Sequence, residues 1–153
     1  MFKDFQIDVF GPRLRVQNQK KALQELSRIA GPVCGAGEDT LFSVFDKRLS
    51  EHGFGWDSGV SVLDVASRHI VRPVVAVVTF EDVLDFNALD GRPVDILGAV
   101  ISPDGDVPTH LQKLSWLSRV LRNEKLCGSL RSAKDEDAMR VLFLPSQDWF
   151  VAA

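Results

Sequence analysis

Two stretches of the chain are almost continuously apolar, and they predict its central strands. Residues 73–80 read PVVAVVTF, and residues 93–102 read PVDILGAVIS. Runs of β-branched residues without alternating polar positions are typical of strands covered on both faces. Near the N-terminus the apolar residues alternate instead. Residues 1–16 are therefore either an edge strand or a segment laid across the domain, with a turn at Gly11-Pro12.

Helical spacing of apolar residues predicts a first helix from about Asn18 to Ala30. The side chain of Asn18 can cap the free N–H groups at its start, and Gly31-Pro32 ends it. Its buried face contains Ala22, Leu23, Leu26 and Ile29.

A second helix is predicted to begin after Asp39 or Thr40 and to end near Ser50. Its buried face contains Leu41, Phe42, Phe45 and Leu49. Arg48 lies in its last turn, where a cation complements the helix dipole. This residue therefore has a structural explanation that needs no ligand.

The stretch after this helix is rich in glycine, which allows the backbone to take positive φ and to approach a ligand closely. The glycines concerned are Gly53, Gly55 and Gly59. The short apolar run at residues 60–63 predicts a strand that ends on the carboxylate of Asp64. The stretch is either the wall of a binding site or a simple helix-to-strand connection. Trp56 within it is either a partner contact or a cap over the pocket.

A long amphipathic helix is predicted from about Thr109 to Arg122. With Thr109 as its N-cap, His110 lies in the first turn, beside unpaired backbone N–H groups. The side chains expected to face the core are Leu111, Leu114, Leu117, Val120 and Leu121. Shorter helices follow near residues 123–131 and 135–143. Helices that alternate with buried strands predict a three-layer α/β/α sandwich with a central mixed sheet.

Composition narrows the class of protein. The chain has 153 residues, 45% of them hydrophobic and 25% charged, which fits one globular domain over residues 1–153. A net charge of −3 gives no electrostatic case for a nucleic-acid partner, which would call for a basic face. No apolar run approaches the roughly 20 residues that span a bilayer. Cys34 and Cys127 form no disulfide framework, which favours a location in the reducing cytoplasm over export.

Three separated histidines do not predict a metal site, and we expect no cofactor.

Candidate chemistry is limited to three side chains. The sequence contains no phosphate-binding P-loop, nucleophile elbow or paired-histidine metal motif. Arg48 is a fixed cation, Asp64 an anion, and His110 lies at a helix start. A guanidinium and a helix N-terminus are both suited to holding a phosphoryl group. Because sites in an α/β sandwich gather where strand ends meet helix starts, we expect the three side chains to meet in one shallow, solvent-reachable depression.

Longer motifs carry a family resemblance. They are QKKALQELSRIAG, FSVFDKRLSEHG, FNALDGRPVDILGAVISP and THLQKLSWLSRVLRNEKLCGSLRSAKDEDA. In order and spacing the chain resembles, from about Asn18 to Phe143, the enzyme IIA domain of the bacterial phosphoenolpyruvate-dependent phosphotransferase system. It resembles the fructose/mannitol branch, and within that branch it is most similar to the nitrogen-regulatory IIA proteins.

The resemblance implies a role for each of the three side chains. The family's loop arginine falls on Arg48, and its second active-site histidine falls on His110. The family's phosphorylated histidine lies in a Pro-His-Gly tripeptide, which here reads Leu63-Asp64-Val65. Asp64 therefore takes the phosphoacceptor position. The glycine loop departs from the family too, since it contains Trp56 and Asp57.

This replacement leaves two interpretations of Asp64. It either imitates the phosphorylated state as a permanent anion, or it fills a pocket whose catalysis has decayed. We expect a cytoplasmic regulatory protein that is not phosphorylated and acts through protein partners. For this branch the resemblance implies control of transporters, kinases or metabolic enzymes. The alternatives are an active phosphocarrier, which receives phosphate from an HPr-type donor through His110 or Asp64, and a small-molecule-binding domain.

Overall fold

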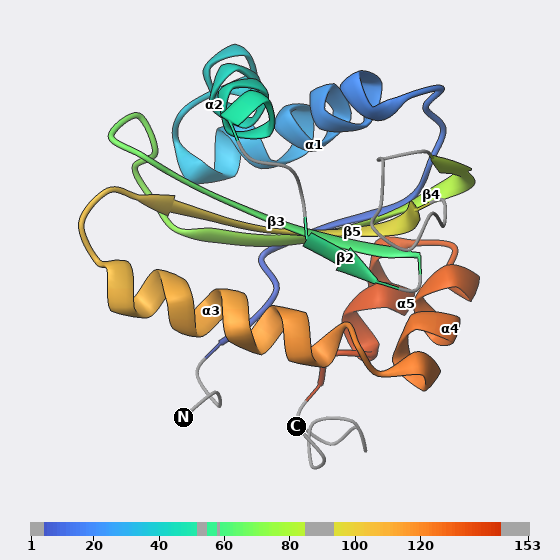
Figure 1. Cartoon of the computed structure of the whole chain (residues 1–153). Coiled ribbons are helices and arrows are strands. Elements are labelled where there is room, and N and C mark those ends of the chain that lie inside the picture. Colours follow the sequence, from blue (N-terminus) through green and yellow to red (C-terminus); the bar gives the residue numbers. More distant parts are fainter. Residues whose placement is uncertain (1–4, 52–54, 58, 85–93, 145–153) are drawn as a thin grey trace.

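The protein forms a five-stranded sheet between two layers of helices (Figure 1). The computed structural model describes residues 5–51, 55–57, 59–84 and 94–144. The strands are β1 (Val9–Leu14), β2 (Gly55–Asp57), β3 (Val60–Ser67), β4 (Val74–Leu84) and β5 (Val94–Pro103). The helices are α1 (Gln19–Cys34), α2 (Glu38–Glu51), α3 (Val107–Val120), α4 (Glu124–Ser132) and α5 (Glu136–Val141).

The predicted sandwich with a mixed sheet is confirmed. The strand order is β1-β4-β5-β3-β2, in which β1 is parallel to β4 and β3 is parallel to β5. The other two pairs, β4 with β5 and β2 with β3, are antiparallel. Helices α1 and α2 cover one face of the sheet, and α3, α4 and α5 cover the other (Figure 1).

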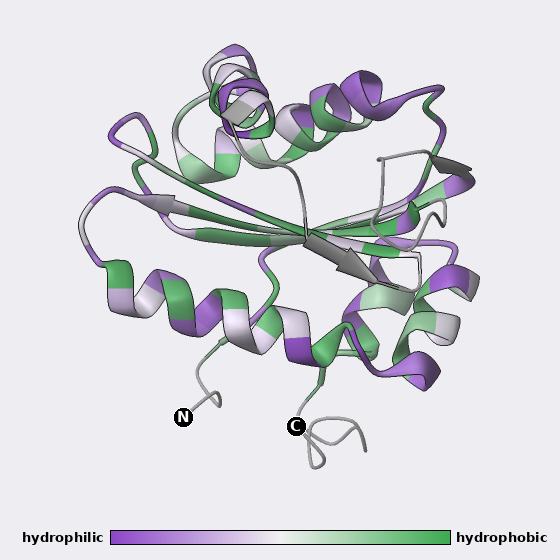
Figure 2. Ribbon diagram, viewed as in Figure 1, coloured by the Kyte–Doolittle hydropathy of each residue, from purple (hydrophilic) through white to green (hydrophobic). Residues whose placement is uncertain are grey.

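The two continuous apolar runs are interior strands, as predicted. Neither β4 nor β5 lies at an edge of the sheet, and both are predominantly hydrophobic along their length (Figure 2). Side chains from alternate positions enter two separate cores. Ala76 and Val78 pack under α1 and α2, whereas Val75 and Val77 pack against the α3 layer. Burial on both faces explains why these strands lack polar alternation.

Within the N-terminal segment, residues Val9–Leu14 form an edge strand, which agrees with one of the two predicted alternatives. However, Gly11-Pro12 lies inside β1 and not in a turn. The strand accommodates the proline because it is at the edge, and its register with β4 shifts between Gly11 and Leu14. Arg13 takes a positive φ of 47° there, and its N–H bonds to the hydroxyl of Thr79 at 2.8 Å.

The first helix is longer than predicted. Asn18 caps it as expected, but Pro32 lies inside the helix, which continues to Cys34. The proline costs one backbone hydrogen bond. The extra turn is held by the burial of Cys34 and by Gly35, whose left-handed conformation lets its N–H bond to the carbonyl of Gly31. The second helix starts at Glu38, slightly before the predicted start.

The predicted end of the strand at Asp64 is wrong. Strand β3 continues to Ser67, because every residue from Val60 onward pairs in register with parallel strand β5. Leu63 and Val65 point into the core under α1 and α2, so Asp64 between them lies on the opposite face. The stretch predicted as a glycine loop also contains a strand, since β2 pairs with the start of β3.

The long helix begins earlier than predicted. Its N-cap is Asp106, not Thr109, and a proline occupies its first turn, where no N–H is needed. The backbone N–H of His110 is therefore bonded, to the carbonyl of Asp106 at 3.1 Å. Leu111, predicted to face the core, is 54% exposed, and Trp116 is buried instead. His110, Leu117 and Leu121 share the inward stripe, from which Leu111 is turned away.

The two short helices lie close to their predicted ranges, with Asn123 and Asp135 as N-caps. The turn predicted at residues 86–91 and the segment 145–153 lie outside the described residues. No helix in the described part of the chain is long and apolar enough to cross a membrane.

Candidate functional site

Arg48, Asp64 and His110 meet in the structure, as predicted. Arg48 Nη2 lies 3.2 Å from Asp64 Oδ1, and Arg48 Nε donates to the main-chain oxygen of Asp64 at 3.1 Å. His110 Nε2 lies 2.8 Å from Asp64 Oδ2. Each residue comes from a different layer: α2, the sheet and α3. Asp64 therefore connects both helical layers to the sheet.

The sheet topology makes this meeting possible. The described residues of β2 pair with Val60, Ser61 and Val62, and among the described residues no strand pairs with the edge of β3 beyond them. Arg48, at the end of α2, reaches this edge and binds the carbonyl of Asp64 there. The carboxylate of Asp64 lies on the face that α3 covers, where His110 points toward the sheet.

Ser102 is a fourth member of the site, which the sequence reasoning missed. Its Oγ lies 2.7 Å from His110 Nδ1, and its side chain is buried. In the ladder between β3 and β5, Asp64 pairs with Val100 and Ala66 pairs with Ser102. Asp64 and Ser102 therefore lie on the same face of neighbouring strands, and the imidazole ring bridges them. The predicted strand at 93–102 ended on this serine, but only the register with β3 reveals its partner.

The site holds Asp64 in its ionised form. The hydrogen bond from His110 is the largest cause that lowers the pKa of Asp64 below its ordinary value of 3.8, and the guanidinium of Arg48 lowers it further. Partial burial opposes both contacts without cancelling them. Because an ionised carboxylate only accepts hydrogen bonds, His110 Nε2 must be protonated. Arg48 Nη1 is buried and has no hydrogen-bond partner within the described structure.

The residues predicted as a binding loop are placed only in part. Gly55 and Trp56 belong to β2, and their backbones pair with Val62 and Ser61. Gly59 has a positive φ of 85°, and its carbonyl accepts the N–H of Asp95 at 3.0 Å. This gives Gly59 a structural role at the start of β3. Gly53 lies outside the described residues, and contact of this stretch with a ligand stays a prediction.

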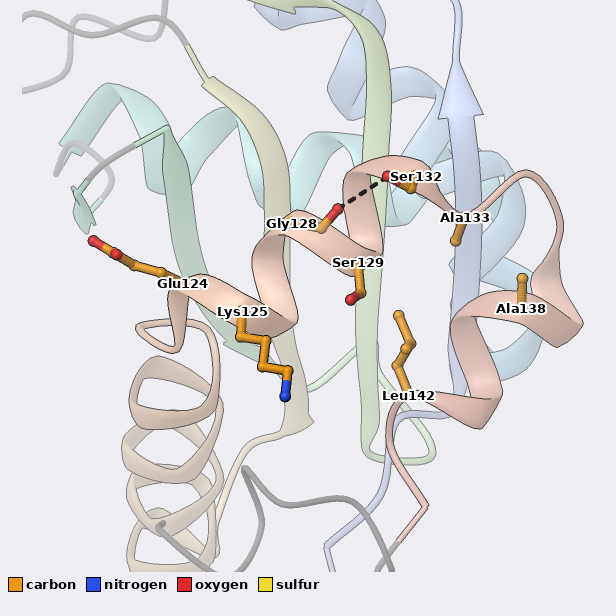
Figure 3. A pocket seen from close by; sticks show the side chains of 8 residues that line it. All are labelled: Glu124, Lys125, Gly128, Ser129, Ser132, Ala133, Ala138 and Leu142. Carbon is orange, nitrogen blue, oxygen red and sulfur yellow. Dashed lines mark hydrogen bonds between the residues drawn. The ribbon is translucent and has the colours of Figure 1, made fainter.

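A groove of about 450 Å³ lies elsewhere, between α4 and α5 (Figure 3). Lys125, Ser129 and Leu142 are among its lining residues, and none of the four site residues lines it. Within the described ranges, no group of three or more His, Cys, Asp or Glu side chains is placed to hold a metal ion. The site itself brings a cation, an anion and an imidazole into contact.

Comparison with models of known protein families shows which family the chain belongs to. Residues 5–144 match the model of the family described as phosphoenolpyruvate-dependent sugar phosphotransferase system, EIIA 2. The chain belongs to this family. The match covers all four site residues and all the helices and strands of the sandwich.

Individual relatives agree with this assignment. The chain is 31% identical over 137 residues to a nitrogen regulatory protein of Bradyrhizobium diazoefficiens, covering 88% of each chain. The IIA-Ntr structure from Neisseria meningitidis has the same fold, with a TM-score of 0.80 at 18% identity, over 89% of this chain and 92% of that one. Mannitol IIA of Escherichia coli, solved in complex with phosphorylated IIB, has a TM-score of 0.70 at 9% identity, over 87% and 92%.

Proposed function

We propose that this IIA-family protein is a regulator of the nitrogen-regulatory type that acts by contacting partner proteins and does not relay phosphate. The similarity to nitrogen regulatory proteins along most of the chain supports the first part. The contacts of Asp64 support the second. We further propose that residues 1–153 act as one domain in the cytoplasm, where the free thiols of Cys34 and Cys127 are stable.

The observation that carries the proposal is the carboxylate of Asp64, held between Arg48 and His110. The family resemblance assigns this position to the phosphorylated histidine. A neutral imidazole nitrogen attacks a phosphoryl donor readily, whereas a carboxylate is a poorer nucleophile and would form an acyl phosphate. The two groups that would suit a phosphoryl oxygen already bind the carboxylate. Asp64 thus supplies a permanent negative charge at the site.

The alternative acceptor, His110, is in an unsuitable state for phosphotransfer. Nucleophilic attack needs an unprotonated and accessible ring nitrogen. Nε2 is protonated and donates to Asp64, while Nδ1 faces the buried hydroxyl of Ser102. The side chain of His110 is only 10% exposed. These contacts favour the hypothesis of a regulatory protein over that of an active phosphocarrier that uses His110.

Partner binding tests the regulatory role. Purified transporters, kinases and metabolic enzymes of nitrogen metabolism would be titrated against the protein and against Asp64→Asn, which keeps the shape but removes the charge. A partner that binds the unmodified protein should bind Asp64→Asn at least several-fold more weakly. Asp46→Asn, which removes an exposed carboxylate on α2, should bind like the unmodified protein.

The phosphate-independent part of the proposal is tested in the same titration. Prior incubation with phosphoenolpyruvate, enzyme I and an HPr-type donor should leave the affinity unchanged. A partner whose affinity changes after this incubation would contradict the proposal, because the protein would then respond to phosphate transfer. Equal binding of Asp64→Asn and the unmodified protein by every partner would contradict the role assigned to the charge.

A further inference from the structure

The imidazole ring of His110 is held at both nitrogens by groups from neighbouring strands. Nε2 contacts Asp64 on β3 at 2.8 Å, and Nδ1 contacts Ser102 on β5 at 2.7 Å. The backbone N–H of His110 is fixed as well, by the carbonyl of Asp106. A ring with two hydrogen-bonded nitrogens and a tethered backbone has one orientation, in which Nε2 faces the carboxylate.

We propose that Ser102 is a positioning residue: it locks the ring of His110 so that Nε2–H is presented to Asp64 in both protonation states of the imidazole. A hydroxyl is suited to this task because it both donates and accepts. When the ring is neutral, the Ser102 O–H donates to the lone pair of Nδ1. When the ring is protonated, Nδ1–H donates to the Ser102 oxygen. The Nε2–H bond to Asp64 is kept in either state.

The role of Ser102 is separate from the packing of β5. Ser102 lies at the end of this strand, beyond the apolar residues Val100 and Ile101. An alanine there would fill most of the same volume but would leave Nδ1 without its partner. The ring would then be held at one nitrogen only, and the hydrogen bond between His110 Nε2 and Asp64 would be present only part of the time. Ser102 therefore acts on the carboxylate through His110.

The pKa of Asp64 is a measure of how firmly Ser102 holds the ring of His110. Two charged or titratable groups face its carboxylate in the described structure, Arg48 from α2 and His110 from α3; the neighbouring strand β5 presents Val100. Since the hydrogen bond from His110 is the largest cause of the lowered Asp64 pKa, loosening the ring raises that pKa toward its ordinary value. Arg48 is untouched by a change at Ser102, so part of the shift should remain.

The test is a carbon-13 NMR titration of the Asp64 carboxyl in the full-length protein. In Ser102→Ala the titration midpoint should move upward, to a value between those of the unmodified protein and His110→Gln. Ser102→Thr, which keeps the hydroxyl, should have the same titration midpoint as the unmodified protein. Ser27→Ala is the matched control: it removes another buried serine hydroxyl, on α1, that donates to the carbonyl of Leu23 at 2.7 Å. It should leave the midpoint unchanged.

A second variant guards against loss of folding. Ser102→Cys preserves the size of the side chain but replaces the hydroxyl with a weak hydrogen-bonding group, and it should also raise the midpoint. Unchanged midpoints in Ser102→Ala and Ser102→Cys would overturn the proposal. An equal rise in Ser27→Ala would also overturn it, because the effect would then come from general loosening. The inference rests on the proposed function only for the importance of Asp64. The titration uses neither phosphate nor a partner, so the two can fail independently.

Discussion

Arg48 binds the main chain and the side chain of the same residue, Asp64. Its Nε donates to the Asp64 carbonyl at 3.1 Å, and its Nη2 lies 3.2 Å from the carboxylate. One planar guanidinium thus fixes both the position of the strand and the orientation of its charged side chain. The geometry explains why an arginine at the end of α2 is more than a complement to the helix dipole.

Replacing this arginine with lysine tests the double contact. Lysine keeps the charge, but its single ammonium group cannot reproduce the guanidinium fork. We expect Arg48→Lys to lower the free energy of unfolding by roughly 1 kcal/mol, the worth of one hydrogen bond, and to raise the pKa of Asp64. Urea unfolding and carbon-13 titration measure the two effects. Arg28→Lys, on an exposed face of α1, is the control. If both variants behave alike, the double contact has no special importance.

Stability should depend on pH through Asp64. Its folded-state pKa lies below its ordinary value of 3.8, so the unfolded chain binds the proton more readily. The stabilisation is therefore fully present above the unfolded pKa and is lost as pH falls through the lower folded pKa. Asp64→Asn should unfold more easily than the unmodified protein at neutral pH, and the difference should shrink in acid. Urea unfolding at a series of pH values measures it. A difference that stays constant down to the acid limit would refute the linkage.

Restoring a histidine at position 64 should not restore efficient phosphotransfer. The neighbours Leu63 and Val65 are buried in β3, where the family resemblance expects proline and glycine. An imidazole in this regular strand would lie between Arg48 and His110, but without the family's backbone around it. We expect Asp64→His to accept phosphate far more slowly than a IIA protein with the Pro-His-Gly tripeptide. Transfer at a comparable rate would show that Asp64 alone prevents the reaction.

The inward face of α3 can be tested with two leucines on the same helix. Leu117 is fully buried, and Leu117→Ala should cost about 2–5 kcal/mol, as for other leucines truncated in a core. Leu111 is 54% exposed, and Leu111→Ala should change the free energy of unfolding by no more than about 0.5 kcal/mol. Chemical denaturation measures both. Comparable losses would show that the helix is rotated from the orientation described.

The sequence predicts the presence of helices and strands better than it predicts the residues at which they begin and end. Strands β4 and β5 follow from hydrophobic pattern alone, because both of their faces are buried. The extension of β3 past Asp64 depends on pairing with β5, and the continuation of α1 past Pro32 depends on the tertiary burial of Cys34. No local pattern contains either interaction. The N-cap at Asp106 is different, since an aspartate followed by Val107-Pro108 is a helix start that could have been recognised.

The candidate site shows the same limit. The sequence shows that Arg48 is a cation, Asp64 an anion and His110 an imidazole at a helix start. The family motifs indicate that the three belong to one site. Ser102 could not be found in this way, because a serine at the end of an apolar strand carries no chemical signal. Its partnership with His110 comes from the register between β3 and β5 together with the placement of α3.

The most direct measurement of the central claim is the intact mass of the protein after incubation with phosphoenolpyruvate, enzyme I and an HPr-type donor. A IIA protein with the Pro-His-Gly tripeptide, in the same reaction, confirms that the donors are active. We predict that this chain gains no phosphoryl group while the control protein does. Stoichiometric phosphorylation would contradict the account. Acid-labile label on His110 would make the protein a phosphocarrier through that residue, and hydroxylamine-sensitive label on Asp64 would make it one through an acyl phosphate.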